Sequence, residues 1–291
     1  MRDGRTSELT RAALLAVGIS AALGCGLMPP EEEQAPLPDP DVEDPARGTL
    51  PPAGYALVLD EGFDGAALDA RRWTALNARR RDALATPAAV AVSGGVLTLT
   101  TSTEAGVHQT GFVTTDRKFL ARYGYFEARI RFNDAPGSWC AFWLLSPTVG
   151  TPRGDPGRAG TEIDVVEHRV TDQSGWDLAD MVQMAINWDG YDSNRKNLNE
   201  VVALPGGAGV QGEWRTYGVL WTAEGYTFYV DGTALWSTTA AVSHVAQDVR
   251  LTCEVLDGSW AGDVPRGGYG PRGVSTTRME VDWVRVWQPA S

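Results

Sequence analysis

The sequence is poor in the residues that metal-dependent and serine-triad hydrolases need. It has only three histidines, His108, His168 and His244, and they lack the spacing of metal ligands. It also has no Gly-x-Ser-x-Gly segment, which would carry the nucleophile of an α/β-hydrolase. These absences argue against both classes, and we expect catalysis, if any, to need no cofactor.

Long hydrophobic runs are also missing. The apolar run at residues 12–23 follows three arginines and is too short to span a membrane, which is typical of an export signal. It ends in Ala-Leu-Gly-Cys, which resembles a bacterial lipobox with Cys25 as the lipidated residue. We therefore expect residues 1–25 to be a signal peptide and the protein to be exported, as a cell-surface or outer-membrane lipoprotein or in secreted form. A plain signal peptide with an incidental cysteine is the alternative.

Residues 26–54 lack the apolar side chains that a folded segment needs. They contain eight prolines and many acidic residues, so we expect a disordered linker. Residues 55–291 then form one folded domain, which we expect to be a monomer. The cysteines that remain there, Cys140 and Cys253, either form a disulfide or stay as buried free thiols.

Positive charge is in short supply, since the formal net charge is -12. A strongly acidic protein repels phosphate backbones, so nucleic acid is an unsuitable partner. A neutral sugar polymer feels no such repulsion. The 11 tryptophans fit a sugar-binding surface, although tryptophan is also a common core residue.

Long helical patterns are absent as well. Apolar residues instead alternate with polar ones, as at residues 96–100, 123–132 and 226–230, which predicts β-strands. Asp231-Gly232 between two such segments predicts a hairpin, because glycine accepts the positive φ of a tight turn. Many short strands with glycine-rich breaks predict an all-β sandwich or barrel.

One predicted strand carries three acids, Glu162, Asp164 and Glu167. Glu162 and Asp164 share a face because side chains alternate along a strand, whereas Glu167 would face the opposite side. A one-residue bulge near Val165-Val166 would bring all three acids to one face. Without that bulge a catalytic role fails, and an edge strand with acids facing water is the alternative.

With the bulge, the two glutamates are about four strand steps apart, or roughly 13 Å between their backbones. Side chains that lean together can then approach the roughly 5 Å carboxyl separation of a retaining glycosidase. We assign Glu162 as the nucleophile and Glu167 as the acid/base. Asp164 would share a proton with a neighbour and help to keep Glu167 protonated.

The segments around this strand resemble glycoside hydrolase family 16, the laminarinase and lichenase group. The likeness extends from about Tyr55 to Trp287, and the acid motif has the bulged, laminarinase-like form rather than the shorter lichenase form. It is carried by Asp60-Glu61-Gly62-Phe63-Asp64-Gly65 with Trp73, and by residues 123–131, 141–145, 217–221, 226–232 and 281–287.

The resemblance implies a β-jelly-roll sandwich of two antiparallel sheets with a concave substrate cleft, retention of configuration, and the roles assigned above. It also implies residues that contact the sugar chain. These are Trp139, Trp143, Asn187, Trp188, Glu254 and Trp260, and His168 is added because it adjoins Glu167. Three alternatives stay open: Phe142 in place of Trp143 facing the cleft, a packed His168, and a solvated Glu254. Asn187 stands where family members often have histidine, so the family's sugar preference does not transfer.

Several family members hold a structural calcium ion, and Asp282 and Gly95 are the matching positions. One carboxylate is few for an ion that takes six to eight oxygens. A solvent-facing Asp282 is the alternative.

The leading hypothesis is an endo-acting hydrolase of a β-linked polysaccharide, with a β-1,3- or β-1,3/1,4-glucan preferred. A galactan such as agar or carrageenan is the second substrate class. A transglycosylase and a non-catalytic lectin are the other hypotheses.

Overall fold

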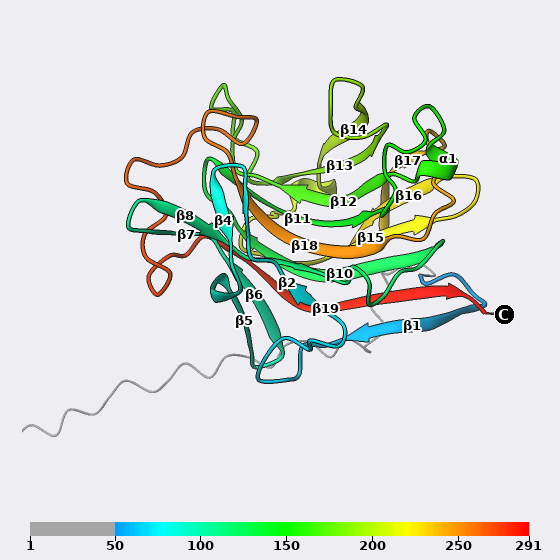
Figure 1. Cartoon of the computed structure of the whole chain (residues 1–291), viewed down its shortest axis with the longest axis horizontal. Helices are drawn as coiled ribbons and strands as arrows, with labels where there is room; N and C mark the ends of the chain where they lie inside the picture. The colour runs from blue at the N-terminus through cyan, green and yellow to red at the C-terminus, as the bar shows by residue number, and fades with distance from the viewer. Residues whose placement is uncertain (1–49, 291) are drawn as a thin grey trace, which may run out of the picture. The chain divides into compact units, whose positions relative to one another are not determined.

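The computed structural model describes residues 50–290, and these form an almost wholly β-stranded unit (Figure 1). Within that range the only helical segments are α1 (Pro156–Ala159) and the 3-10 turns η1 (Pro87–Ala89) and η2 (Pro205–Gly207). None of its helices is long and apolar enough to cross a membrane. The predicted signal peptide, including Cys25, and nearly all of the predicted linker lie outside the described residues.

The first sheet has eight strands. In spatial order they are β17 (Thr233–Thr238), β16 (Tyr226–Val230), β15 (Trp214–Trp221), β10 (Gly124–Asn133), β19 (Arg278–Pro289), β6 (Val96–Thr100) and β5 (Val90–Ser93), and β1 (Tyr55–Glu61) also pairs with β19.

The second sheet has seven strands and carries the acid motif on its third strand. Their order is β14 (Lys196–Ala203), β13 (Met181–Trp188), β12 (Glu162–His168), β11 (Ser138–Leu145), β18 (Asp248–Val255), β9 (Phe112–Thr114) and β2 (Thr74–Ala75). The strands that flank β12 therefore decide what its acidic side chains meet.

The two sheets stack with the main core between them, which confirms the predicted antiparallel sandwich (Figure 1). Alternate residues supply this core, such as Leu97 and Leu99 from β6 and Phe142 and Leu144 from β11. A third, four-stranded sheet was not predicted. It contains β3 (Ala78–Arg80), β4 (Ala83–Ala85), β8 (Val107–Thr110) and β7 (Ser102–Glu104), and its β4–β8 pair is parallel.

The predicted hairpin joins β16 to β17. Asp231 and Gly232 both have positive φ, 49° and 74°, as a two-residue turn between twisted strands requires. Aspartate tolerates this conformation better than most residues, and glycine has no side chain to clash.

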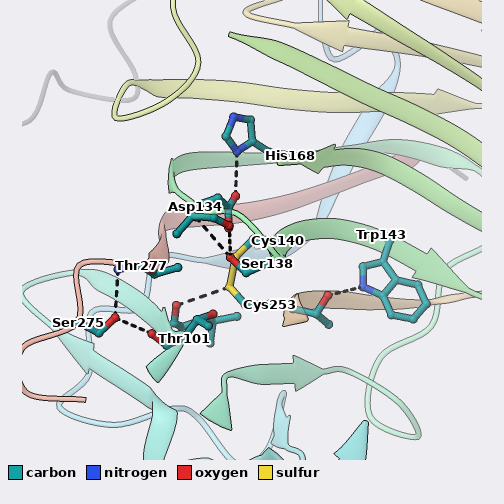
Figure 2. Close-up of a disulfide and its surroundings, with 12 residues drawn as sticks. Thr101, Asp134, Ser138, Cys140, Trp143, His168, Cys253, Ser275 and Thr277 are labelled. Carbon is teal, nitrogen blue, oxygen red and sulfur yellow. Dashed lines mark hydrogen bonds and ion pairs between the residues drawn. A yellow bond between two sulfur atoms is a disulfide. The ribbon is translucent and has the colours of Figure 1, made fainter. Parts of the chain in front are cut away.

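Cys140 and Cys253 form a disulfide, which settles the alternative that the sequence left open (Figure 2). They lie directly opposite each other on the neighbouring strands β11 and β18, and both are buried. The bond ties the strand beside β12 to the strand that carries Glu254.

Removing this disulfide should destabilise the fold. It closes a sequence separation of 113 residues, and a crosslink of that span restricts the unfolded chain strongly. We expect a variant with alanine at both positions to lose about 2–4 kcal/mol of unfolding free energy. Urea titration with and without reductant checks this. If reductant breaks the bond in the wild type but leaves the urea midpoint of unfolding unchanged, the disulfide does not stabilise the fold.

Candidate active site

Strand β12 contains the predicted bulge. Against β11, Phe142 pairs with Val166 and Trp143 pairs with Asp164, so Val165 is the extra residue. The register with β13 shifts at the same place. Both valines are buried in the core between the sheets, while the three acids share the opposite face. The bulge therefore brings Glu167 to the same face as Glu162 and Asp164, as the spacing of the motif predicted.

Hydrogen bonds from the next strand and its loop hold the two glutamates. Asn187 Nδ2 donates to Glu162 Oε1 at 2.9 Å and to Asp164 Oδ2 at 2.7 Å. The Tyr191 hydroxyl donates to Glu162 Oε2. Gln183 Nε2 donates to Glu167 Oε2 at 3.2 Å. Glu162 thus accepts two hydrogen bonds and Glu167 accepts one. The two carboxyl groups therefore have different polar surroundings.

The acidic side chains are difficult to ionise together. Burial, followed by the charges of both glutamates, raises the pKa of Asp164 well above its usual range. Burial and the charge of Glu162 raise the pKa of Glu167 to about 7. Burial also raises the pKa of Glu162, but the hydrogen bond from Tyr191 and the charge of Arg195 oppose this. The hydrogen bond from Tyr191 and the charge of Arg195 therefore favour ionisation at Glu162, whereas Glu167, with a pKa of about 7, can still carry a proton near neutral pH.

These acids line a cleft of about 780 Å³ that crosses the second sheet. The cleft is lined by alternate residues of five neighbouring strands, β14, β13, β12, β11 and β18. Neighbouring strands are about 4.8 Å apart, so this row is roughly 19 Å wide. Such a cleft can hold a chain of several sugars across the acids.

Comparison with known proteins identifies the family. The family model of the β-porphyranase A–D GH16 domain matches residues 58–289. The chain belongs to glycoside hydrolase family 16. This confirms the family that the sequence resembled.

Among curated relatives, endo-1,3-1,4-β-glycanase ExsH of Rhizobium meliloti (strain 1021) is 28% identical over 205 residues, 67% of this chain and 39% of the relative. Keratan-sulfate endo-1,4-β-galactosidase of Sphingobacterium multivorum is 26% identical over 262 residues, which cover 82% of this chain and 57% of the relative. The chain thus spans about two fifths to three fifths of these relatives. The endo-β-1,3-glucanase structure from Pyrococcus furiosus superposes with a TM-score of 0.65 at 20% identity, covering 80% of this chain and 94% of that one. This likeness supports the family 16 jelly-roll fold.

Three of the predicted tryptophans line the cleft, but two of them expose little surface. Trp139 is 4% exposed and Trp143 is 7% exposed, while Phe142 faces the core. Trp260 meets Trp139 edge to face. Trp143 Nε1 donates to Thr252 Oγ1 at 3.1 Å, which fixes its indole ring in the cleft wall.

Arginine is the residue type that the sequence reasoning missed in this family 16 cleft. Five arginines line it, although the whole chain has a net charge of -12. Three guanidinium groups lie over the tryptophan rings: Arg81 over Trp139, Arg250 over Trp143 and Arg169 over Trp260, at 5.1, 4.9 and 4.1 Å from the ring centroids. Aromatic faces and positive charge therefore occur together along the cleft.

Two predicted substrate contacts are wrong. His168 is fully buried on the core side of β12, where its Nδ1 lies 2.8 Å from Asp134 Oδ2 (Figure 2). Its Nε2 lies 2.9 Å from the Ala179 carbonyl oxygen. Trp188 packs against the core and is not part of the cleft lining. Each directly follows a residue that faces the cleft, and alternation turns it to the other side of the sheet.

Asn187 and Glu254 are both in the cleft, as predicted. Asn187 is 2% exposed and contacts two of the acids. Glu254 is paired with Arg80, with 2.8 Å between Oε1 and the guanidinium, so it is not the solvated charge of the alternative. Its negative charge is thereby compensated at the end of the cleft near Trp139.

The carboxylate matched to the family's calcium site is paired with an arginine in this structure. Arg129 NH1 donates to Asp282 Oδ2 at 2.7 Å and already neutralises that carboxylate. Within residues 50–290 no group of three acidic, histidine or cysteine side chains is placed to hold a metal. Calcium binding by Asp282 and Gly95 remains a prediction of the resemblance alone.

Several further cleft residues carried a signal that alternation could have revealed. Gln183 lies opposite Glu167 in the β12–β13 register, as the predicted Asn187 lies opposite Glu162. Asn197 and Asn199 continue the same polar face on β14. Tyr191 and Arg195 come from the loop between these strands, whose course nothing in the sequence specifies.

Proposed function

We propose that this family 16 protein is a retaining endo-glycosidase that cuts internal β-linkages of a polysaccharide through a covalent glycosyl-enzyme. The observation that carries the proposal is the placement of Glu162, Asp164 and Glu167 on one face of a bulged strand across the cleft. A retaining mechanism needs one ionised and one protonated carboxyl group on either side of the reacting bond.

In the first step a carboxylate oxygen of Glu162 attacks the anomeric carbon. The bond to the leaving oxygen breaks, and that oxygen takes the proton of Glu167. In the second step Glu167, now ionised, takes a proton from water, and the water oxygen displaces Glu162. Two inversions restore the β-configuration. The pKa of about 7 at Glu167 suits a group that both gives and takes a proton.

Asp164 stays protonated in this scheme, which avoids a third negative charge beside the nucleophile. Burial and both glutamates keep its pKa well above the usual range. Its carboxyl group also shares the Asn187 amide with Glu162, so it helps to fix the nucleophile's position.

A β-1,3- or β-1,3/1,4-glucan is the first substrate candidate. ExsH is named as an endo-1,3-1,4-β-glycanase, and the superposable Pyrococcus furiosus structure is an endo-β-1,3-glucanase. The cleft's width across five strands supports endo action, because a chain can lie across it with sugars on both sides of the acids.

A sulfated galactan is the second candidate, and the cleft arginines favour it. The five arginines face four carboxylates in the lining, and two of those carboxylates, Asp164 and Glu167, resist ionisation. The excess positive charge suits an anionic polymer better than a neutral one. The matching family model describes β-porphyranases, and one relative is named as a keratan-sulfate galactosidase.

A substrate panel tests the proposal. Purified protein is incubated with laminarin, mixed-linkage glucan, agarose, carrageenan, porphyran and keratan sulfate, and new reducing ends and product lengths are measured. We expect internal cleavage of at least one polymer with retention at the new end. If a sulfated galactan is preferred, removing its sulfate chemically or adding salt should raise KM, whereas hydrolysis of a neutral glucan should be insensitive to salt.

Glu162→Gln is the control in this panel and should bind polymer without cutting it. Polymer binding by wild type and Glu162→Gln with no reducing ends from either would support a lectin instead. Products longer than a supplied oligosaccharide would support a transglycosylase, in which another sugar hydroxyl replaces water in the second step.

We also propose that the protein is exported, with an N-terminal lipid anchor at Cys25 and no other contact with a membrane. The support is the leader sequence together with the disulfide between Cys140 and Cys253, because such bonds persist mainly in oxidising compartments. Fractionation of producing cells tests this, since a Cys25→Ala variant should leave the membrane fraction.

A further inference from the structure

Asn187 connects the catalytic acids to a second group of polar residues. Its side chain is buried, and both hydrogens of its Nδ2 are used, one on Glu162 Oε1 and one on Asp164 Oδ2. Its Oδ1 accepts from three donors: Arg195 Nε at 3.0 Å, Arg195 NH2 at 2.6 Å and Asn197 Nδ2 at 2.8 Å. The amide is therefore fully hydrogen-bonded at both ends.

The orientation of this amide matters, because its two ends have opposite polarity. If Asn187 turned by 180°, its oxygen would face two carboxyl groups, and its NH2 would face a guanidinium group that has no acceptor. The pair of hydrogen bonds from Arg195 allows only one orientation, since a guanidinium donates and cannot accept. Arg195 thus holds the Oδ1 end of the amide away from the acids, in the orientation that the Glu162 carboxylate also needs.

We infer that Arg195 is a positioning residue for the reaction: its two hydrogen bonds to Asn187 Oδ1 aim the Asn187 amide at Glu162 and Asp164, and so hold the nucleophile in place and in charged form. This role rests on the proposed retaining mechanism for its effect on turnover. The structural part of it, the control of Glu162 by Arg195 through Asn187, does not.

The surroundings of Glu162 define what else acts on it. Besides Asp164 and Glu167 on its own strand, it faces Tyr191 and Arg195 from the β13–β14 loop, Arg250 from β18 and Arg81 from the β3–β4 turn. Among the described residues, Arg195 is the arginine that hydrogen-bonds to Asn187, while Arg250 pairs with Asp248 and lies over Trp143. Arg250 is therefore a matched control: it contributes charge without touching the amide.

Arg195 has an exposed side, so direct contact with the sugar is the rival role.

A double-mutant cycle separates the positioning role from direct sugar contact. Arg195→Met, Asn187→Ala and the double variant are compared for kcat and KM, with Arg250→Met and its double with Asn187→Ala alongside. If Arg195 acts through Asn187, we expect Arg195→Met to lower kcat about 10- to 100-fold with little change in KM, and to add almost nothing once Asn187 is alanine. The effect of Arg250→Met on kcat should instead be the same whether residue 187 is asparagine or alanine.

A second readout needs no turnover. In protein labelled with 13C at glutamate carboxyl groups, the Glu162 signal is assigned by its loss in Glu162→Gln and titrated in wild type, Arg195→Met and Arg195→Lys. We expect the Glu162 titration to move to higher pH in Arg195→Met. It should move in the same direction in Arg195→Lys, because a lysine keeps the charge but cannot form the same pair of hydrogen bonds.

An additive cycle with a Glu162 titration unchanged in both Arg195 variants would overturn the inference. A wild-type protein that cuts no polymer would instead contradict the proposed function, and the titration would still decide the role of Arg195.

Discussion

Replacing Glu162 with alanine should abolish hydrolysis, and azide should restore cleavage with inverted configuration. Without the carboxylate there is no attacking group on that side of the sugar, and we expect kcat to fall by at least ~10³-fold on a substrate with a good leaving group. Azide can occupy the space of the missing side chain and attack from the same side. The product would then be the α-glycosyl azide, which proton NMR identifies.

Glu167→Ala should respond to azide in the opposite sense. Glu162 still forms the glycosyl-enzyme from a substrate with a good leaving group, and azide then attacks where Glu167 would have activated water. The product should be the β-glycosyl azide. Glu167→Gln should also lose the alkaline limb of the pH profile near pH 7, because the proton with a pKa of about 7 is gone.

Glu254→Gln is the control for these variants, since Glu254 is a cleft carboxylate paired with Arg80 and away from the bulged strand. It should give no azide product. If the two azide products came out with exchanged configurations, the roles of Glu162 and Glu167 would have to be exchanged as well.

Alternation along strands explains both the successes and the errors of the sequence-based reasoning. The odd spacing of Glu167 forced a bulge, and the structure has it at Val165. The same rule, applied to the next residue, places His168 in the core, and applied to Asn187 and Trp188 it allows only one of them in the cleft. Trp188 was placed by the family resemblance, which does not say which face of the strand a residue occupies, whereas for His168 the packed alternative is the correct one.

The arginine lining could not be predicted in this way, because it is assembled from distant segments. Arg80 and Arg81 come from the small sheet, Arg169 from the end of β12, Arg195 from a loop and Arg250 from β18. The overall charge of -12 pointed to the opposite sign. Net charge describes the whole surface, whereas the field that a substrate meets is set by the few groups around the cleft.

The bulge at Val165 should tolerate deletion of its extra residue. With Val165 removed, β12 would become a regular strand in which Glu162, Asp164 and Glu167 still alternate onto the cleft face. This spacing is that of the shorter, lichenase-like motif. We expect the deletion variant to fold, to lose about 1.5–3 kcal/mol from the missing buried valine, and to keep activity within about 100-fold of wild type.

Deletion of Ile163 is the matched control, since it removes one buried apolar residue from the same strand. Whichever end of β12 then keeps its register, one of the three acids must turn into the core between the sheets. An unpaired buried carboxyl group is costly, so this variant should be far less stable and inactive. Thermal unfolding and reducing-end assays compare the two deletions. A folded but inactive Val165 deletion would mean that the extra residue sets the distance between the glutamates, and that a common face is not enough.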